Sequence, residues 1–240
     1  MTTPTPDNRY MSRSEAQAAE IDVGLRQYML QIYNYMASGV ALTGIVAYAV
    51  ANTPALFNAI FGTPLMWVVM LAPLGLALFF GMRIQHMKAS TAQALFWVFA
   101  SVMGMSLATI FVVFTGESIA RVFFITAGTF AAMSLYGYTT KRDLSRFGSF
   151  LMMGLIGVIL ASLVNLFIGS TALQFAVSVI GVLVFVGLTA YDTQQIKEMY
   201  WDADDEETYK KKSIMGALRL YLDFINLFML LIQLLGARRE

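Results

Sequence analysis

Long, continuous apolar runs alternate with short polar links over most of the chain. A hydrocarbon core about 30 Å thick requires about twenty apolar residues in a crossing helix. Seven runs meet that length, at residues 30–51, 65–84, 93–114, 119–138, 148–169, 172–191 and 214–235. The runs do not alternate between apolar and polar positions, which disfavours the strands of a membrane β-barrel. The pattern predicts an all-α integral membrane protein, a bundle of seven transmembrane helices.

The N-terminal segment departs from this pattern because it is polar. It lacks the basic start, the short apolar core and the small-residue cleavage site of a secretory signal. The stretch SRSE, Ser12 to Glu15, fits a capping box, so we expect a short helix to begin there and lead into the first membrane segment. The chain therefore divides into a polar cytoplasmic tail, residues 1–27, and a seven-helix transmembrane domain, residues 28–240.

Basic residues gather at one end of the predicted bundle. With seven spans, twelve of the sixteen Lys and Arg residues fall on the side of the N-terminal tail. Cytoplasmic links of membrane proteins carry an excess of Lys and Arg. The distribution predicts a cytoplasmic N-terminus and a C-terminus on the outside. Small residues at helical spacing, Gly104/Ala108 and Gly128/Ala132, predict close approach between helices.

Composition makes lipid a part of the solvent and excludes several kinds of site. The 240 residues are 58% hydrophobic and 13% charged, more apolar than a soluble domain can hide. The formal net charge of +1 gives no reason to expect a nucleic-acid partner. The absence of cysteine excludes disulfides, thiolate metal sites and cysteine nucleophiles, and a single histidine, His86, excludes a histidine pair.

Asp223 is the most costly residue to place in a membrane. It lies nine residues into the last apolar run, roughly 13 Å at 1.5 Å per residue. A charged aspartate at that depth costs about 2.5–3.5 kcal/mol, so the side chain should face the bundle interior or water. Arg219, one turn earlier, could pair with it, and that pair alone could account for the residue. Asn226, three residues later, shares its face and offers an amide oxygen.

A second acid, Asp192, sits at the cytoplasmic end of the sixth run. Taken alone, it is a helix-end residue that meets water, and a simple depth count places it well away from Asp223. Consecutive antiparallel helices are usually neighbours, however, and could bring the two carboxyl groups together. Such a pair would share a proton and titrate as a unit. Deprotonated, it would offer up to four oxygens to a cation such as calcium, which takes six to eight.

Two sequence stretches resemble the Bax inhibitor-1, or transmembrane Bax inhibitor motif, family in its bacterial YccA-like branch. They are GLTAYDTQQIKEMY and LYLDFINLFMLLIQLLG, and residues 123–157 are also similar to that family. The resemblance implies a seven-helix bundle with the last helix central, in the bacterial inner (plasma) membrane. It implies a pH-sensitive calcium leak channel whose sensor is the Asp192 and Asp223 pair, with calcium bound there transiently. A second-helix arginine of the family, best matched by Arg83, would pair with Asp192.

An alternative function also follows from the resemblance. Members of the YccA-like branch are linked to a membrane-bound ATP-dependent protease as substrate and modulator, and the polar tail could be the segment that the protease grips. Enzymes are disfavoured, because the chain lacks the G-x-G-D and P-A-L sequences of intramembrane aspartyl proteases and His86 lies in a charged link. With no ATP-binding loop either, we predict a passive protein without a resident cofactor. The acidic run DADDEE, residues 202–207, is predicted to be solvated and is not an EF-hand.

Overall fold

A computed structural model describes the backbone of residues 13–239 and the side chains of residues 22–239. Its helices are α1 (Arg13–Ala51), α2 (Pro54–Phe61), α3 (Leu65–Arg83), η1 (Ile84–His86), α4 (Ala89–Leu107), α5 (Thr109–Val113), α6 (Gly116–Thr139), α7 (Ser145–Ile168), α8 (Thr171–Glu198) and α9 (Glu206–Leu235). Seven helical segments are long and apolar enough to cross a membrane. The predicted all-α, seven-span membrane protein is thereby confirmed.

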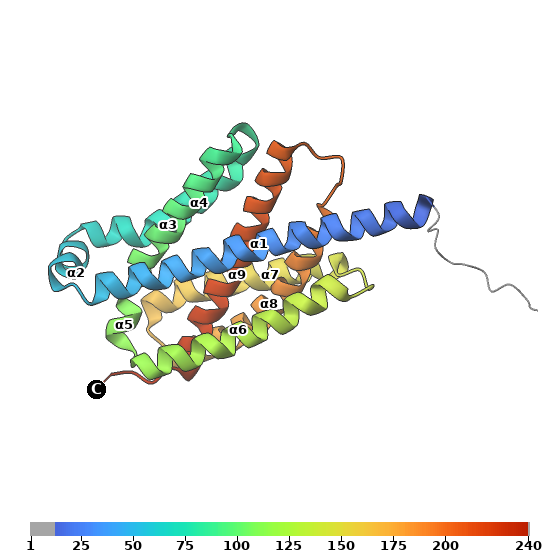
Figure 1. Cartoon of the computed structure of the whole chain (residues 1–240). Coiled ribbons are helices and arrows are strands. Elements are labelled where there is room, and N and C mark those ends of the chain that lie inside the picture. The colour runs from blue at the N-terminus through green and yellow to red at the C-terminus, as the bar shows by residue number, and fades with distance from the viewer. Residues whose placement is uncertain (1–12, 240) are drawn as a thin grey trace, which may run out of the picture.

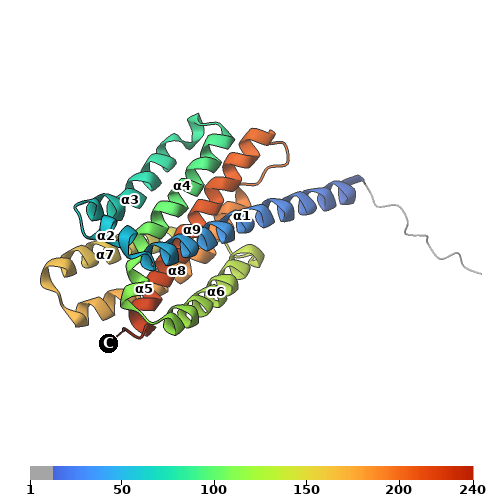
Figure 2. The same cartoon turned by 60° about the vertical axis from the view of Figure 1, so that its left-hand side comes forward.

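The last helix, α9, is the centre of the bundle (Figure 1). It packs against α1, α4, α6 and α8, while α3 packs mainly on α4 and α7 mainly on α8. In the most apolar window of α9, 56% of residues are buried, compared with 6% for α7. The predicted central position of the last helix is confirmed. Four helices flank it directly, and α3 and α7 form an outer layer, as Figure 2 shows from a second direction.

The first helix is longer than its apolar run. It continues without a break from Arg13 into the first membrane segment, so residues 13–27 of the predicted tail are helical. Ser12, the proposed capping residue, and the earlier part of the tail lie outside the described residues. The predicted link between the first two spans contains a further helix, α2, with Pro54 at its start. Proline suits the first helical turn, where its missing N–H is not needed.

The third predicted span is interrupted at Ala108. Helix α4 ends at Leu107 and α5 begins at Thr109. At the junction, the N–H of Ala108 bonds to the carbonyl of Met105 at 3.3 Å, and the N–H of Phe111 bonds to that of Ala108 at 3.2 Å. These are bonds to the third residue back, which tighten the helix locally.

The chain end is fastened to the link between α5 and α6. The N–H of Thr115 donates to the carbonyl of Ala237 at 3.0 Å, and the N–H of Arg239 donates to that of Val113 at 2.9 Å. The hydroxyl of Ser118 accepts from the N–H of Ala237 at 2.8 Å. These bonds hold the end of the central helix against the helix pair beside it.

Candidate functional site

The two predicted acids belong to the hairpin of α8 and α9. Asp192 lies six residues before the end of α8 and Asp223 seventeen residues after the start of α9, roughly 9 Å and 26 Å along the two axes. The two residues lie at the same height along the helix pair because α9 starts beyond the end of α8. The segment that connects the two helices runs past the end of α8 to the start of α9 (Figure 1).

The structure brings the two carboxyl groups into side-chain hydrogen-bonding contact. Asp223 is buried, with 5% of its surface exposed, and Asp192 is half-buried. A carboxylate has no hydrogen to donate, so two carboxyl groups can bond only when one carries a proton. One oxygen of Asp223, Oδ2, is buried and receives no hydrogen bond from an N–H or O–H group of the described residues. A bond between the two carboxyl groups would therefore need one shared proton, and Oδ2 of Asp223 is a buried acceptor beside it.

Arg219 is the basic residue that acts on this pair. Its guanidinium interacts electrostatically with both Asp192 and Asp223, and it lies one turn before Asp223 on α9. The side chain is exposed, so surrounding ions screen part of this attraction. Arg83, the counter-ion expected from the resemblance, is exposed at the end of α3 and is not among the groups that act on the pair within the described part of the chain.

Asn226 is half-buried, one turn after Asp223. Its amide nitrogen donates to the backbone carbonyl of Leu222 at 2.8 Å, which leaves the amide oxygen as an acceptor. Among the described residues, no group of three or more His, Asp or Glu side chains is gathered to hold a metal ion. A cation at the pair would draw most of its six to eight oxygens from water and backbone carbonyls.

The Y-D-T-Q stretch around Asp192 connects α8 to several neighbours. Tyr191 lies so close to Gly148 of α7 that a Cβ there would come within 2.7 Å of its ring. The hydroxyl of Thr193 is 2.9 Å from that of Ser134 on α6. Gln194 accepts from the N–H of Leu144 and donates to the carbonyl of Arg142, both at 2.8 Å. Four consecutive side chains therefore reach α7, α9, α6 and the link between α6 and α7.

A chain of hydroxyl groups leads from α1 to α8 beside this stretch. Thr193 donates to the carbonyl of Thr189 at 2.7 Å, so its bond with Ser134 takes the hydrogen of Ser134. The hydroxyl of Tyr33 on α1 lies 2.6 Å from Ser134 and is left to donate to it. Sequence reasoning missed Tyr33, Ser134, Thr193 and Gln194. The available signal was a polar side chain within an apolar run, which has to find a partner when buried.

The acidic run is exposed as predicted, apart from half-buried Asp204, and four of its five acids also have local partners. Asp204 pairs with Lys212, Glu206 pairs with Lys210, and the carboxylate of Glu207 accepts from the N–H of Ala89. Asp205 caps α9, and the hydrogen bond from Thr208 lowers the pKa of its carboxyl. The run starts the central helix and ties it to α4. His86 lies exposed in η1, in the link where it was predicted.

Comparison with known proteins places almost the full chain in one family. The family model described as inhibitor of apoptosis-promoting Bax1 matches residues 25–240. Inner membrane protein YbhL of Escherichia coli is 49% identical over 219 residues, covering 90% of this chain and 94% of that protein. An uncharacterized protein of Rickettsia prowazekii is 53% identical over 219 residues, covering 91% and 93%. One of Caulobacter vibrioides is 46% identical over 230 residues, covering 92% of each.

Proposed function

Since the chain belongs to the Bax inhibitor-1 family of membrane proteins, we propose that it is a passive, pH-sensitive cation leak channel of the bacterial inner membrane. Calcium is the permeant ion. The observation that carries this proposal is the contact between the carboxyl groups of Asp192 and Asp223 in the core of the bundle.

The pair couples proton binding to the packing of the central helix. With one proton, the carboxyl groups hydrogen-bond and hold α8 against α9. Without it, two negative charges about 4 Å apart repel by about 4 kcal/mol at an effective dielectric constant of 20. A neutral hydrogen bond such as that between Tyr33 and Ser134 contributes only about 0.5–1.5 kcal/mol. Loss of the shared proton would therefore weaken the packing of α8 against α9.

A divalent cation relieves the same repulsion. The ionised pair offers up to four oxygens, among them the buried Oδ2 of Asp223, and Asn226 on the same helix adds an amide oxygen. This set falls short of the six to eight ligands of a resident calcium ion. An incomplete shell favours passage over storage, because an ion must bind weakly enough to leave.

Calcium flux through the purified protein tests the proposal. In proteoliposomes, we expect the wild-type flux to change between pH 5 and pH 8, and the Asp223→Asn variant to lose that dependence because its amide cannot ionise. The Asp192→Asn variant should also lose the pH dependence of calcium flux. Asp202→Asn is the matched control, since Asp202 is an exposed acid in the link before α9. A wild-type pH profile in Asp223→Asn would exclude the pair as the sensor.

A further inference from the structure

A groove runs along the seam between α1 and α6, apart from the aspartate pair. It consists of two cavities of about 490 Å³ and 290 Å³. Both are lined by α1 and α6, the first from Arg26 to Ala37 on α1 and the second from Val40 to Ala47. The two helices run beside each other in both Figure 1 and Figure 2.

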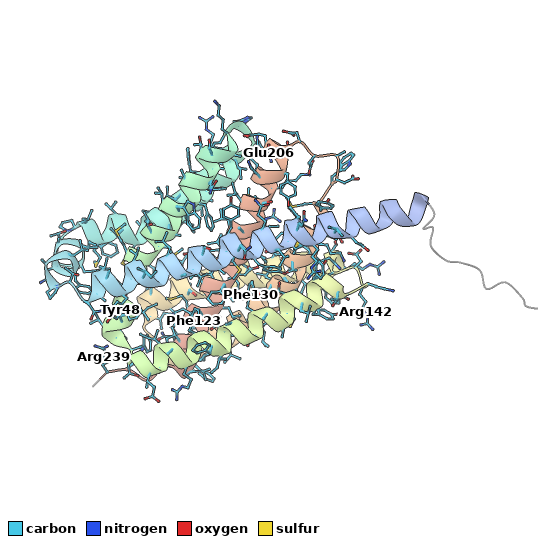
Figure 3. The ribbon with its side chains drawn as sticks, in the orientation of Figure 1. Tyr48, Phe123, Phe130, Arg142, Glu206 and Arg239 are labelled. Carbon is cyan, nitrogen blue, oxygen red and sulfur yellow. The ribbon has the colours of Figure 1, made fainter. Side chains whose placement is uncertain are left out.

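The floor of the groove is aromatic. Phe224 of α9 packs edge-on against Phe130 and Phe123 of α6, both at 5.6 Å between ring centres, and Phe123 contacts Phe228 at 6.5 Å. Figure 3 shows Phe123 and Phe130 in the space between α1 and α6. Leu30 and Leu135, on opposite walls of the first cavity, are 51% and 62% exposed, so the groove opens sideways. In a membrane that opening faces lipid.

Charge is confined to one end of the groove. Arg26 is the charged residue that lines the first cavity, and the side chains that line the second carry no charge. Tyr138 lies at the same end, with the ammonium of Lys197 5.6 Å from its ring centre. The hydroxyl of Tyr33, also in the lining, adds a polar group one step deeper. The groove thus has a basic, hydrogen-bonding mouth and an apolar interior.

We propose that this groove binds an anionic phospholipid, with its phosphate at Arg26 and one acyl chain along the first cavity. Eleven residues separate Arg26 from Ala37, roughly 16 Å of helix and about half of a 30 Å hydrocarbon core. The first cavity therefore has the length of one chain in one leaflet. Three turns of a partner helix 10 Å wide would occupy on the order of 1,200 Å³, well above the 490 Å³ present.

Lipid retention tests the mouth of the groove. Wild-type protein in detergent micelles is given equal amounts of phosphatidylglycerol and phosphatidylethanolamine, and bound lipid is counted by native mass spectrometry. We expect one phosphatidylglycerol to be retained preferentially. Arg26→Gln should lower that preference about fivefold, the effect of one basic residue facing an anionic head group. Arg146→Gln, at an exposed arginine of α7 outside the groove, is the control and should leave it unchanged.

The interior is tested by a matched pair of substitutions on α6. Ala131 lines the first cavity and its neighbour Ala132 does not, and both side chains are exposed. Ala131→Trp should fill the groove and abolish the tightly retained phosphatidylglycerol, whereas Ala132→Trp should retain it. Ala37→Leu, on the opposite wall, provides a second filling variant if Ala131→Trp does not fold.

Three outcomes would overturn the proposal. The first is equal retention of the two lipids by the wild type, and the second is equal retention of phosphatidylglycerol by Ala131→Trp and Ala132→Trp. The third is a dimer in the wild type that Ala131→Trp disrupts, because the groove would then hold a second copy of the chain. None of these measurements depends on calcium flux, so they stand apart from the channel proposal.

Discussion

Asp223 carries the largest local cost in the protein, and three neighbours offset it. The side chain is buried in the central helix, where an unpaired charge costs about 2.5–3.5 kcal/mol. The carboxyl group of Asp192 contacts it, Arg219 adds a positive charge, and half-buried Asn226 adds a polar surface nearby. None of these alone gives full compensation, since Arg219 is exposed and Oδ2 of Asp223 receives no hydrogen bond from an N–H or O–H group of the described residues.

Removing Arg219 should shift the pH response of the proposed channel without abolishing it. The guanidinium favours the ionised pair, so in Arg219→Gln the pair should keep its proton to higher pH. We expect the midpoint of the flux profile to rise by about half a pH unit, below the 1–3 units of a closely paired charge because the arginine is exposed. Calcium flux measured in steps from pH 5 to pH 8 checks this.

Arg83→Gln is the matched control for that experiment. Arg83 is also exposed but lies at the end of α3 and is not among the groups that act on the pair in the described structure. Its flux midpoint should stay where the wild type has it. A shift in Arg83→Gln with none in Arg219→Gln would reverse the assignment of the counter-ion.

The sequence identified the two acids but not how they meet. The cost of burying a charge singles out Asp223, because that cost depends only on residue type and depth. The depth count separated it from Asp192 because it took the last helix to begin with its apolar run, at residue 214. Helix α9 begins at Glu206, capped by Asp205. Capping and packing extend a helix beyond its apolar run. Hydropathy locates only the apolar run, so it could not predict where α9 begins.

Hydropathy located all seven spans, since bilayer thickness fixes the length of a crossing helix. It missed α2 and the break at Ala108, which depend on contacts between helices. Of the two small-residue pairs predicted to lie at close helix contacts, one does and the other does not. A Cβ on Gly104 would come within 2.7 Å of the carbonyl of Thr43 on α1, so that position is a close helix contact as predicted. Gly128 faces open space, and its predicted contact is wrong within the described structure.

Gly137 and Gly128, both on α6, offer a direct test of close packing. A Cβ on Gly137 would lie 2.2 Å from the carbonyl oxygen of Ala190 on α8, and backbone cannot move aside as a flexible side chain can. Gly137→Ala should therefore cost about 1–3 kcal/mol of unfolding free energy. Gly128→Ala should be neutral or stabilise by up to about 1 kcal/mol, because alanine favours the helix.

Denaturation of both variants in the same detergent measures that difference. The wild type serves as the reference, and near-ultraviolet circular dichroism follows loss of helix packing. Equal stability of the two variants would mean that α6 and α8 are not held together at Gly137. The result would also bear on the aspartate pair, since Ala190 lies two residues before Asp192 on α8.

The arrangement of the bundle relates its two proposed sites. The central helix α9 contributes Asp223 to the pair with α8 and Phe224 to the floor of the groove between α1 and α6. These are consecutive residues that face different neighbours. A displacement of α9 on loss of the shared proton would therefore also move the floor of the groove. Proton and lipid would act on the same helix from two sides.

The orientation of the bundle in the membrane decides which leaflet contains the lipid groove. The distribution of Lys and Arg predicts that the end with Arg83 and Lys88 is cytoplasmic and that the C-terminus is outside. Figure 3 shows Arg142 and Arg239 at opposite ends of α6, as this prediction requires. The two ends of α3 allow a direct test, because Thr63 precedes that helix, Ser90 follows it, and both are exposed.

Single cysteines at these two positions should label from opposite sides. The chain has no cysteine of its own, so each substitution adds the one reactive thiol. In intact spheroplasts, a membrane-impermeant maleimide should label Thr63→Cys fully and Ser90→Cys only after permeabilisation. The reverse pattern would place Arg26 and its lipid groove in the outer leaflet. Labelling of both cysteines in intact spheroplasts would mean that α3 does not cross the membrane, which would contradict the seven-span fold itself.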